Sequence, residues 1–405
     1  MTKTLLIISG GIEAADAVIR ARDMGLNVVV SDIDPNAPSF AYANDRLIAD
    51  VYGPEATLAA AERYTREHGP IHGVLCVAAD APVTAALVAE KLKLPGISVE
   101  SAKLASDKLA MKRRFQACGV PVPWFASVAS AEELKAIIAE RGSDLVIKPV
   151  DSRGSRGVQR LSRTADIDAA FALAQKHSPT ARVMVETYLQ GPQISTESIV
   201  IGGQCFTPGF ADRNYELLEV HAPFFIENGG DLPSHLPQSI QDKVKGVVAQ
   251  GAAALGVTDG TVKGDIVVHG GEPYIIELAA RLSGGFFCTL EIPLNTGVDF
   301  IGCAIRVALG ETVTPAELEP KRQQPVIQRY AFPKPGRVVQ VRGAETAKRL
   351  AGIAGIVVTA KPGDIIPPAG DKRPSAAMVM ATGSTREAAL AAAQAALGTI
   401  EIETR

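Results

Sequence analysis

Two acidic residues stand on either side of a glycine turn in the segment KGDIVVHGGEPYIIELAARLSGG. The pattern around this turn predicts a β-hairpin with strands at 263–268 and 273–278. Asp265 and Glu277 then fall on neighbouring antiparallel strands, where facing side chains meet. Two carboxylates brought together in this way suit a hard cation such as Mg²⁺, which keeps several waters and shares substrate phosphates. The hairpin therefore predicts a metal site.

An arginine and a turn of small residues follow the hairpin directly. Arg281 carries a planar guanidinium that can hold an anion through two hydrogen bonds, and Ser283-Gly284-Gly285 offers backbone N–H donors. A pair of acids kept only for structure is disfavoured, because like charges repel unless a cation lies between them. This segment is therefore predicted to hold a phosphoryl group during its transfer.

A lysine and a glycine-containing loop stand together earlier in the chain. A predicted buried strand ends in Lys148 and gives way to the loop DSRGSRGV at 151–158. Its residues Gly154, Ser155 and Gly157 let backbone N–H groups approach phosphate oxygens, while the lysine supplies a point charge. The pattern predicts a loop that wraps a polyphosphate. A plain hairpin turn is the alternative, because glycine and serine are common between strands.

A strand that ends in polar residues follows this loop. The backbone of Glu186-Thr187-Tyr188-Leu189 can read the edge of an adenine, and the carboxylate of Glu186 can accept hydrogen bonds from ribose hydroxyls. The alternative is an ordinary strand with a solvated glutamate.

The overall composition of the chain argues against nucleic-acid and membrane partners. The chain has 405 residues, enough for about two or three domains, a formal net charge of -3 and only 5% aromatic residues, so a nucleic-acid partner is not expected. Five cysteines lie far apart without a C-x-x-C pair, which indicates reduced thiols. The N-terminus is too short in apolar length for a signal peptide or a spanning helix. A cytoplasmic protein without a membrane partner is expected.

The helices and strands that must position these residues predict an α/β region followed by α+β regions. The first ninety or so residues alternate apolar strands with helices, which predicts an α/β domain with a parallel sheet. Asp32 is placed like the ribose-binding acid of a dinucleotide fold, but the third glycine of G-x-G-x-x-G is missing, so a purely structural role is favoured. A charged helical stretch beginning SAKLASDK leads into an α+β region, and a smaller α+β unit ends the chain.

In their order and spacing these motifs resemble the ATP-grasp superfamily. The chain is similar to biotin carboxylase, carbamoyl phosphate synthetase, the glycinamide ribonucleotide ligases and especially the bacterial L-amino acid ligases. The resemblance implies an N-terminal Rossmann-like (pre-ATP-grasp) parallel-sheet domain at 1–94. An ATP-grasp domain of two α+β subdomains is implied at 95–312, with a flexible lid at about 120–190, and a closing α+β domain at 313–405.

The resemblance also implies roles for single residues. Arg281 and Lys148 are implied as catalytic residues, and Asp265 and Glu277 as metal ligands. The implied ATP-binding residues are Lys108, Lys148, Ser152, Gly154, Ser155, Gly157, Val158, Glu186, Thr187, Tyr188, Leu189 and Glu197. The implied cofactors are ATP and Mg²⁺, with Mn²⁺ as a substitute, and relatives suggest a homodimer.

One departure from the family pattern bears on the metal. Many relatives read Glu-x-Asn, with the asparagine helping to hold metal, whereas this chain reads Glu277-Leu278-Ala279, as some amino acid ligases do. A second departure is Gln193, where a glutamate is frequent. The number of metal ions therefore stays open, and the amino acid ligase branch is favoured.

The family implies that ATP phosphorylates a small carboxylate and that an amine then attacks the acyl phosphate. Substrate contacts are expected from Arg281, from Ser283, Gly284 and Gly285, and from Arg213 and His221 in the insertion at 209–237. A surface loop is the alternative for this insertion. Two other functions stay open, namely phosphorylation of bicarbonate, as in biotin carboxylase, and nucleotide binding without ligase activity.

Overall fold

The computed structural model describes residues 2–368, 370 and 375–405. It divides into two compact units. Unit 1 comprises Met1–Val122, Ile194–Phe210 and Leu236–Arg322. Unit 2 comprises Pro123–Gln193, Ala211–His235 and Gln323–Arg405. The predicted boundaries after residues 94 and 312 stay a prediction, since compactness alone does not test them.

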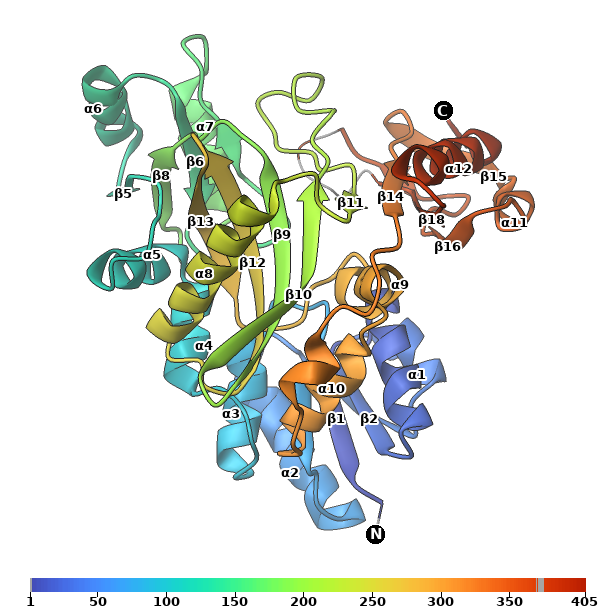
Figure 1. Cartoon of the computed structure of the whole chain (residues 1–405). Helices are drawn as coiled ribbons and strands as arrows, with labels where there is room; N and C mark the ends of the chain where they lie inside the picture. Colours follow the sequence, from blue (N-terminus) through green and yellow to red (C-terminus); the bar gives the residue numbers. More distant parts are fainter. Residues whose placement is uncertain (1, 369, 371–374) are drawn as a thin grey trace. The chain divides into compact units, whose positions relative to one another are not determined.

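Unit 1 begins with a parallel sheet in the order β3-β2-β1-β4. Figure 1 labels its strands β1 and β2. β1 is buried along its whole length, as expected for a strand covered on both faces. This sheet confirms the predicted Rossmann-like pattern. Its elements are β1 (Thr4–Ile8), α1 (Ala15–Asp23), β2 (Asn27–Asp32), β3 (Asp45–Ile48), α2 (Pro54–His68), β4 (Gly73–Cys76) and α3 (Pro82–Lys91).

The loop after β1 is closed by Asp32. The Asp32 carboxylate accepts hydrogen bonds from the backbone N–H groups of Gly10, at 2.8 Å, and Asp34, at 3.0 Å. Both oxygens of this acid are thus engaged by the loops around the first sheet. The structural role favoured from the sequence accounts for Asp32.

The charged stretch predicted as one helical segment forms two helices. α4 (Val99–Ser106) ends at Asp107, and α5 (Lys108–Ala117) begins directly after it. The Asp107 side chain accepts a hydrogen bond from the N–H of Ala110, which caps α5 and places Lys108 in its first turn. The break thus sets the position of a predicted ATP-binding lysine.

The rest of unit 1 is built on strands in the order β13-β12-β9-β10. One face of these strands and α8 share an apolar core that includes Val248, Val262, Ile275 and Leu278. The elements are β9 (Gln193–Ile201), β10 (Gln204–Arg213), α8 (Gln238–Ala254), β12 (Gly260–His269), β13 (Glu272–Ala279), α9 (Ile292–Thr296) and α10 (Phe300–Ala308).

Unit 2 contains an antiparallel sheet in the order β5-β8-β6-β7 with its own core. Ile147, Val185, Leu134 and Phe171 lie in this core, so α6 and α7 cover the sheet. The elements are β5 (Phe125–Val128), α6 (Ala131–Arg141), β6 (Leu145–Pro149), β7 (Gln159–Arg160), α7 (Ile167–Lys176) and β8 (Val183–Thr187).

The C-terminal part of unit 2 contains strands in the order β11-β14-β18-β16 and a small sheet β17-β15-β19. Ala389, Ala393 and Ala396 form the buried face of α12, which packs on β14 and β18. The elements are β11 (Gly230–Leu232), β14 (Val326–Ala331), β15 (Gly336–Arg342), α11 (Ala344–Ala347), β16 (Ile353–Val358), β17 (Ile365–Ile366), β18 (Ala377–Thr382), α12 (Arg386–Thr399) and β19 (Glu401–Thr404). Within the described residues, no helix has the length and apolar character needed to cross a membrane.

Candidate active site

The predicted hairpin is present and places its two acids face to face. β12 and β13 pair in an antiparallel register that sets Asp265 opposite Glu277 and Lys263 opposite Ala279. These four residues therefore lie on one face of the hairpin. Val262 and Ile266 of β12 face the apolar core on the other side. The predicted acid pair is therefore present, and a β-bulge between Ile266 and Asp265, where the register shifts by one residue, brings Glu277 opposite Asp265.

Each of the two acids is paired with a lysine. The Nζ atom of Lys108 lies 3.1 Å from Oε1 of Glu277, and Lys263 forms an ion pair with Asp265. Burial opposes the charge of Lys108, but Glu277 and Asp80 outweigh it and raise the pKa of this lysine above its usual value. Lys108 therefore keeps its positive charge beside the acid pair.

The acid pair fits a hard divalent cation. The side chains of Asp265 and Glu277 are 26% and 25% exposed, so a cation can reach them. The pair supplies only two protein ligands. No group of three or more His, Cys, Asp or Glu side chains that could hold a metal ion is found among the described residues. Mg²⁺ commonly binds one or two carboxylates and completes its shell with waters and substrate phosphates. The donor set fits Mg²⁺ shared with a phosphate.

Arg281 is held beside the end of the N-terminal sheet. The N–H of Leu282 donates to the carbonyl of Cys76 at 3.1 Å, and the N–H of Ala78 donates to the carbonyl of Leu282 at 3.2 Å. The chain after β13 thus extends the edge of β4. Nε of Arg281, whose side chain is 17% exposed, lies 3.6 Å from Oδ1 of Asp80, a residue that sequence reasoning missed. Its only sequence signal is its position just after a parallel strand.

The turn after Arg281 is bonded to two acids. The N–H of Ser283 donates to Oε1 of Glu197 at 3.0 Å, and the N–H of Gly285 donates to Oε2 of Glu13 at 2.8 Å. The same oxygen of Glu13 lies against Gly284, where an added Cβ would be 2.4 Å away. Backbone donors predicted to meet a substrate anion are therefore occupied by carboxylates in this conformation. Glu13 was also missed by sequence reasoning.

Glu197 lies under this turn with no exposed surface. Burial raises the pKa of its carboxyl to about 7, although the hydrogen bond from Ser283 and the charges of Arg281 and Lys263 oppose the shift. Its Oε2 atom is buried without a hydrogen-bond partner. The ATP-binding role that the resemblance implies for Glu197 stays a prediction, while the structure places its carboxylate under the turn as a hydrogen-bond acceptor.

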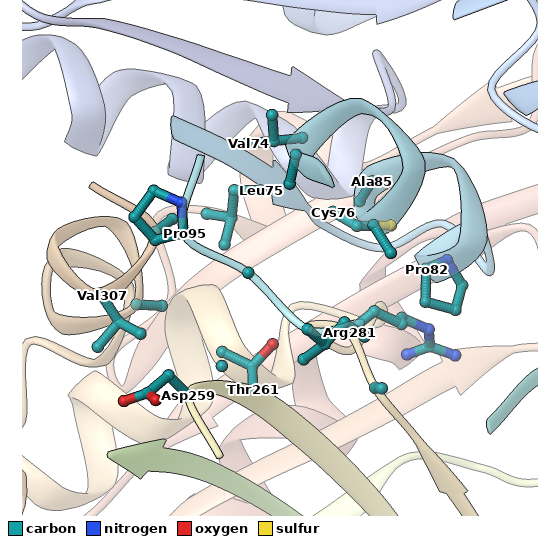
Figure 2. A pocket seen from close by; sticks show the side chains of 18 residues that line it. Val74, Leu75, Cys76, Pro82, Ala85, Pro95, Asp259, Thr261, Arg281 and Val307 are labelled. Atoms are coloured by element: carbon teal, nitrogen blue, oxygen red, sulfur yellow. The ribbon is translucent and has the colours of Figure 1, made fainter. Parts of the chain in front are cut away.

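A small cavity of about 60 Å³ lies between β4, α3, α10 and the start of β12. Figure 2 shows apolar side chains such as Leu75 and Val307 around it, with the guanidinium of Arg281 extending toward Pro82. Ligand pockets usually measure about 300–1,000 Å³. This cavity is therefore too small to be the substrate pocket.

Lys148 and Glu186 form a buried ion pair in unit 2. Their side chains are 6% and 3% exposed and lie on β6 and β8, which are neighbours in the sheet. The acid and the lysine predicted to contact one nucleotide are therefore adjacent. Removing either partner would leave a buried charge uncompensated.

The predicted adenine hinge lies at the end of β8. Two of its backbone donors are engaged within unit 2, because Thr187 N–H donates to the carbonyl of Trp124 and Tyr188 N–H to that of Asp144, both at 2.9 Å. The guanidinium of Arg160 lies 3.9 Å from the centre of the Tyr188 ring. In this conformation an adenine cannot use these two N–H groups. Leu189 completes the predicted hinge.

The predicted phosphate loop connects β6 and β7. Gly154, Ser155 and Gly157 all have positive φ angles, which glycine adopts easily and serine rarely does. Asp151 ties the start of the loop to Ser178, whose hydroxyl donates to it at 2.5 Å. The loop that also holds Ser152 and Val158 is therefore anchored at its base, with backbone geometry suited to a tight curve.

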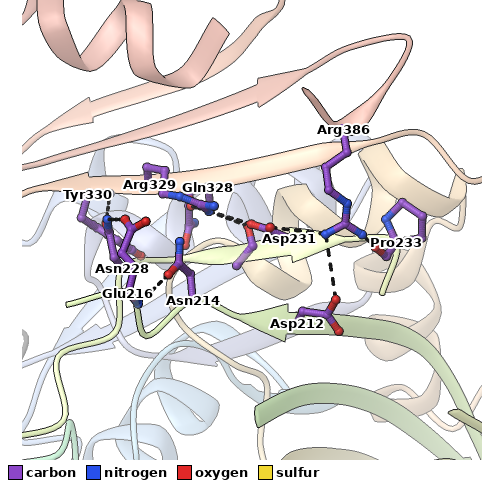
Figure 3. A network of polar contacts seen from close by, with 11 residues as sticks. Asp212, Asn214, Glu216, Asn228, Asp231, Pro233, Gln328, Arg329, Tyr330 and Arg386 are labelled. Carbon is purple, nitrogen blue, oxygen red and sulfur yellow. Dashed lines mark hydrogen bonds and ion pairs between the residues drawn. The ribbon is translucent and has the colours of Figure 1, made fainter. Parts of the chain in front are cut away.

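The insertion is held by ion pairs and hydrogen bonds within unit 2 (Figure 3). Asp231 pairs with Arg329 at 2.7 Å and with Arg386 at 3.3 Å, and Arg386 also lies 3.9 Å from Asp212. Sequence reasoning missed both arginines, because they lie far along the chain from the insertion. The network shows that residues of β14 and α12 position the insertion.

The two substrate residues predicted in the insertion differ in their surroundings. Arg213 forms an ion pair with Glu227, so its charge is neutralised inside the insertion. His221 is half-buried, with its ring 6.4 Å from that of Phe332. Their substrate contacts stay a prediction.

Two family models match the chain. Residues 105–285 match the ATP-grasp domain, and residues 329–405 match L-amino acid ligase C-terminal domain 2. Residues 105–285 form an ATP-grasp domain. The two matches together confirm the predicted recognition of an ATP-grasp protein of the ligase type.

Similar proteins extend these matches. An uncharacterized protein y4rH of Sinorhizobium fredii is 26% identical over 412 residues, covering 99% of this chain and 83% of that protein. A D-alanine–D-alanine ligase of Aromatoleum aromaticum is 26% identical over 234 residues, covering 54% of this chain and 71% of the ligase. The crystal structure of L-amino acid ligase from Bacillus licheniformis has a TM-score of 0.83 at 19% identity and covers 100% of this chain and 99% of its own. These likenesses confirm the predicted fold class.

The ATP-grasp domain takes its predicted site residues from both compact units. Unit 1 holds Lys108, Glu197, Asp265, Glu277, Arg281 and the turn 283–285. Unit 2 holds Lys148, the loop 151–158 and the hinge 186–189. Each set is assembled within its own unit, and common action on one nucleotide belongs to the proposal that follows.

Proposed function

We propose that this chain is an ATP-dependent carboxylate–amine ligase. It phosphorylates a small carboxylate, such as an amino acid, to an acyl phosphate and couples it to an amine, releasing ADP and phosphate. The observation that carries the proposal is the hairpin face on which Asp265 and Glu277 oppose each other with Lys108 at 3.1 Å from Glu277. It lies inside the matched ATP-grasp domain.

The residues divide the work of phosphoryl transfer. A bound Mg²⁺ would supply charge neutralisation at the phosphate oxygens, held by Asp265 and Glu277. Lys108 and Lys148 match the negative charge of the nucleotide, and the loop 151–158 surrounds its phosphates. Arg281, kept in place by Asp80, orients the substrate carboxylate.

The reaction balances without a protein nucleophile. The substrate carboxylate oxygen attacks the γ-phosphorus as the bond to ADP breaks, and the neutral amine then attacks the acyl carbon as inorganic phosphate leaves. The nitrogen gives up one proton as the bond to carbon forms, and the leaving phosphate takes up one proton, so that it departs as HPO₄²⁻. The protein mainly positions the reactants and stabilises charge, which accounts for the many fixed cations around the hairpin.

The choice of an amino acid as substrate rests on the C-terminal match. Residues 329–405 match a domain of L-amino acid ligases, and this region contains Arg329 and Arg386, which hold the insertion. Within the insertion, Arg213 and His221 remain the proposed substrate contacts. The cytoplasmic location and the homodimer stay predictions.

A phosphate-release screen tests the proposal. Amino acids would be supplied singly and in pairs with ATP and Mg²⁺, and bicarbonate in a parallel series. We expect phosphate release that depends on an amino acid. Either Glu277→Ala or Lys148→Ala should reduce the rate of this release at least about 100-fold, because charge stabilisation is lost. Lys135→Ala, which removes an exposed lysine paired with Asp168, is the control and keeps full activity.

Three outcomes are separable in this screen. Release that requires bicarbonate would replace the proposal by a carboxylase-type reaction. ATP binding without release across the whole panel would indicate a binding module. Full turnover in both Glu277→Ala and Lys148→Ala, with folding confirmed by circular dichroism, would remove the assigned site.

A further inference from the structure

Lys263 occupies a specific place on the hairpin. In the register of β12 and β13 it stands opposite Ala279, one pair along from Asp265 and Glu277. Its side chain is 14% exposed and forms an ion pair with Asp265. Side chains that face each other across antiparallel strands project to the same side, so the ammonium group lies on the face that carries the acid pair. None of the roles described above uses this lysine.

Ala279 cannot contribute to a metal site. Its side chain is a methyl group and is 3% exposed, so the position next to Glu277 on this face offers no side-chain oxygen. The position across from it carries a cation instead of a ligand. A second divalent ion at this end of the hairpin would lack a donor and would meet the positive charge of Lys263.

The surroundings of Lys263 favour a fixed charge. The lysine faces Asp265, and its charge also acts on the buried carboxyl of Glu197 on the neighbouring strand β9. A carboxylate can accept from a lysine through one lone pair and still bind a cation through another. Asp265 can therefore serve the metal and Lys263 together.

The geometry points to Lys263 as a positioning residue that supplies the positive charge a second metal ion would otherwise supply, so that the hairpin holds one divalent cation. The inference rests on the proposed ATP-dependent function. The number of metal ions at the hairpin is then set by Lys263. It also predicts that nucleotide affinity depends on the charge of residue 263.

Native mass spectrometry counts the ions directly. The full-length protein would be measured with Mn²⁺ and β,γ-imido-ATP, with nucleotide-free protein as the control for adventitious adducts. We expect one Mn²⁺ per nucleotide-bound chain. In Lys263→Ala/Ala279→Asn, which removes the ammonium group and adds an amide oxygen, we expect two. Two ions in the unaltered protein, or one in this double variant, would overturn the inference.

Nucleotide affinity gives an independent reading. Lys263→Ala should weaken ADP binding at least about tenfold at fixed Mn²⁺, while Lys263→Arg, which keeps the charge, should stay within about threefold. Lys243→Ala is the matched control, because it removes an exposed lysine of α8 that pairs with Glu272 on β13, the other strand of the hairpin. Unchanged affinity in Lys263→Ala would contradict the inference.

Failure of the proposed function would look different. If the unaltered protein bound neither ADP nor β,γ-imido-ATP at any Mn²⁺ concentration, the ATP-dependent function itself would fail and the inference with it. Binding with two ions would remove only the role of Lys263. Thermal unfolding of each variant confirms that the changes in binding do not come from loss of the fold.

Discussion

The site in unit 1 is made of opposite charges held at short range. Lys108 pairs with Glu277, Lys263 with Asp265, and Arg281 with Asp80. Partly buried charges of this kind are stabilised by their partners, and single removals leave a charge without compensation. The same pairs would have to rearrange when a nucleotide and a cation arrive, since both compete for the same groups. Binding of the nucleotide and the cation would therefore exchange these ion pairs for contacts with the ligands.

The buried acid Glu197 predicts a dependence of stability on pH. In the unfolded chain its carboxyl ionises near the ordinary value of 4.5, whereas the folded chain keeps the proton up to about pH 7. The folded state binds more protons between these values, so its stability falls as pH rises through this window. The loss approaches about 3 kcal/mol above pH 7, at about 1.4 kcal/mol per pKa unit.

The variant Glu197→Gln isolates this effect, because glutamine keeps an oxygen for the Ser283 N–H and carries no charge. The unfolding temperature of the variant relative to the native chain should rise from about pH 5 to about pH 8, measured by differential scanning fluorimetry. Glu62→Gln, at an exposed position, is the control. A temperature difference that stays constant with pH would argue against the raised pKa.

At the scale of elements, the hairpin β12–β13 is positioned by close packing against β9. Gly264 lies between Lys263 and Asp265 and faces the opposite side, where an added Cβ would be 2.5 Å from Oγ1 of Thr196 and 2.9 Å from Cδ2 of Leu278. The strand can approach its neighbours this closely because residue 264 has no side chain. The position of the acid pair therefore depends on a glycine on the other face.

Gly264→Ala should destabilise the protein by about 1–3 kcal/mol, since overpacking a core forces neighbours to move. The matched control is Gly246→Ala on α8, where an added Cβ meets nothing within 4 Å and alanine favours the helix by about 1 kcal/mol. Thermal unfolding should therefore move in opposite directions for the two variants. If Gly264→Ala were as stable as the native chain, the strands would be able to move apart at little cost in free energy.

At the scale of the whole molecule, residues far apart in the sequence meet within each unit. In unit 1 the turn after Arg281 is bonded to Glu13, near the start of the chain. In unit 2 the insertion around Asp212 and Asp231 is held by Arg329 and Arg386, near its end. The C-terminal part of the chain thus acts on a segment proposed to bind substrate.

Arg386→Ala tests this long-range support. The arginine is mostly buried and pairs with Asp231 and Asp212, so its loss should cost about 3–5 kcal/mol, as for a broken buried ion pair. Limited proteolysis should cut the insertion at 209–237 faster in this variant. Arg405→Ala, which removes an exposed pair with Glu403, should behave like the native chain. Equal cleavage rates in all three proteins would exclude a supporting role.

Local pattern was enough for much of the fold and for part of the site. The parallel N-terminal sheet followed from continuous apolar runs, and the hairpin followed from alternation around a glycine turn. The predicted facing of Asp265 and Glu277 is present, but the turn alone does not set it, because the register shifts by one residue at a β-bulge between Ile266 and Asp265. The lysine that begins α5 was found by family pattern, but its cap at Asp107 was not.

Only the tertiary structure decided which residues support these groups. Local pattern does not pair Asp80, Glu13, Arg329 or Arg386 with their partners, because those partners lie far along the chain. The sequence itself determined that the hairpin forms, since a short turn and side-chain alternation are local, whereas the register at Asp265 and Glu277 also depends on a β-bulge. Contacts between distant segments depend on how whole cores pack, and no short window of residues contains that information.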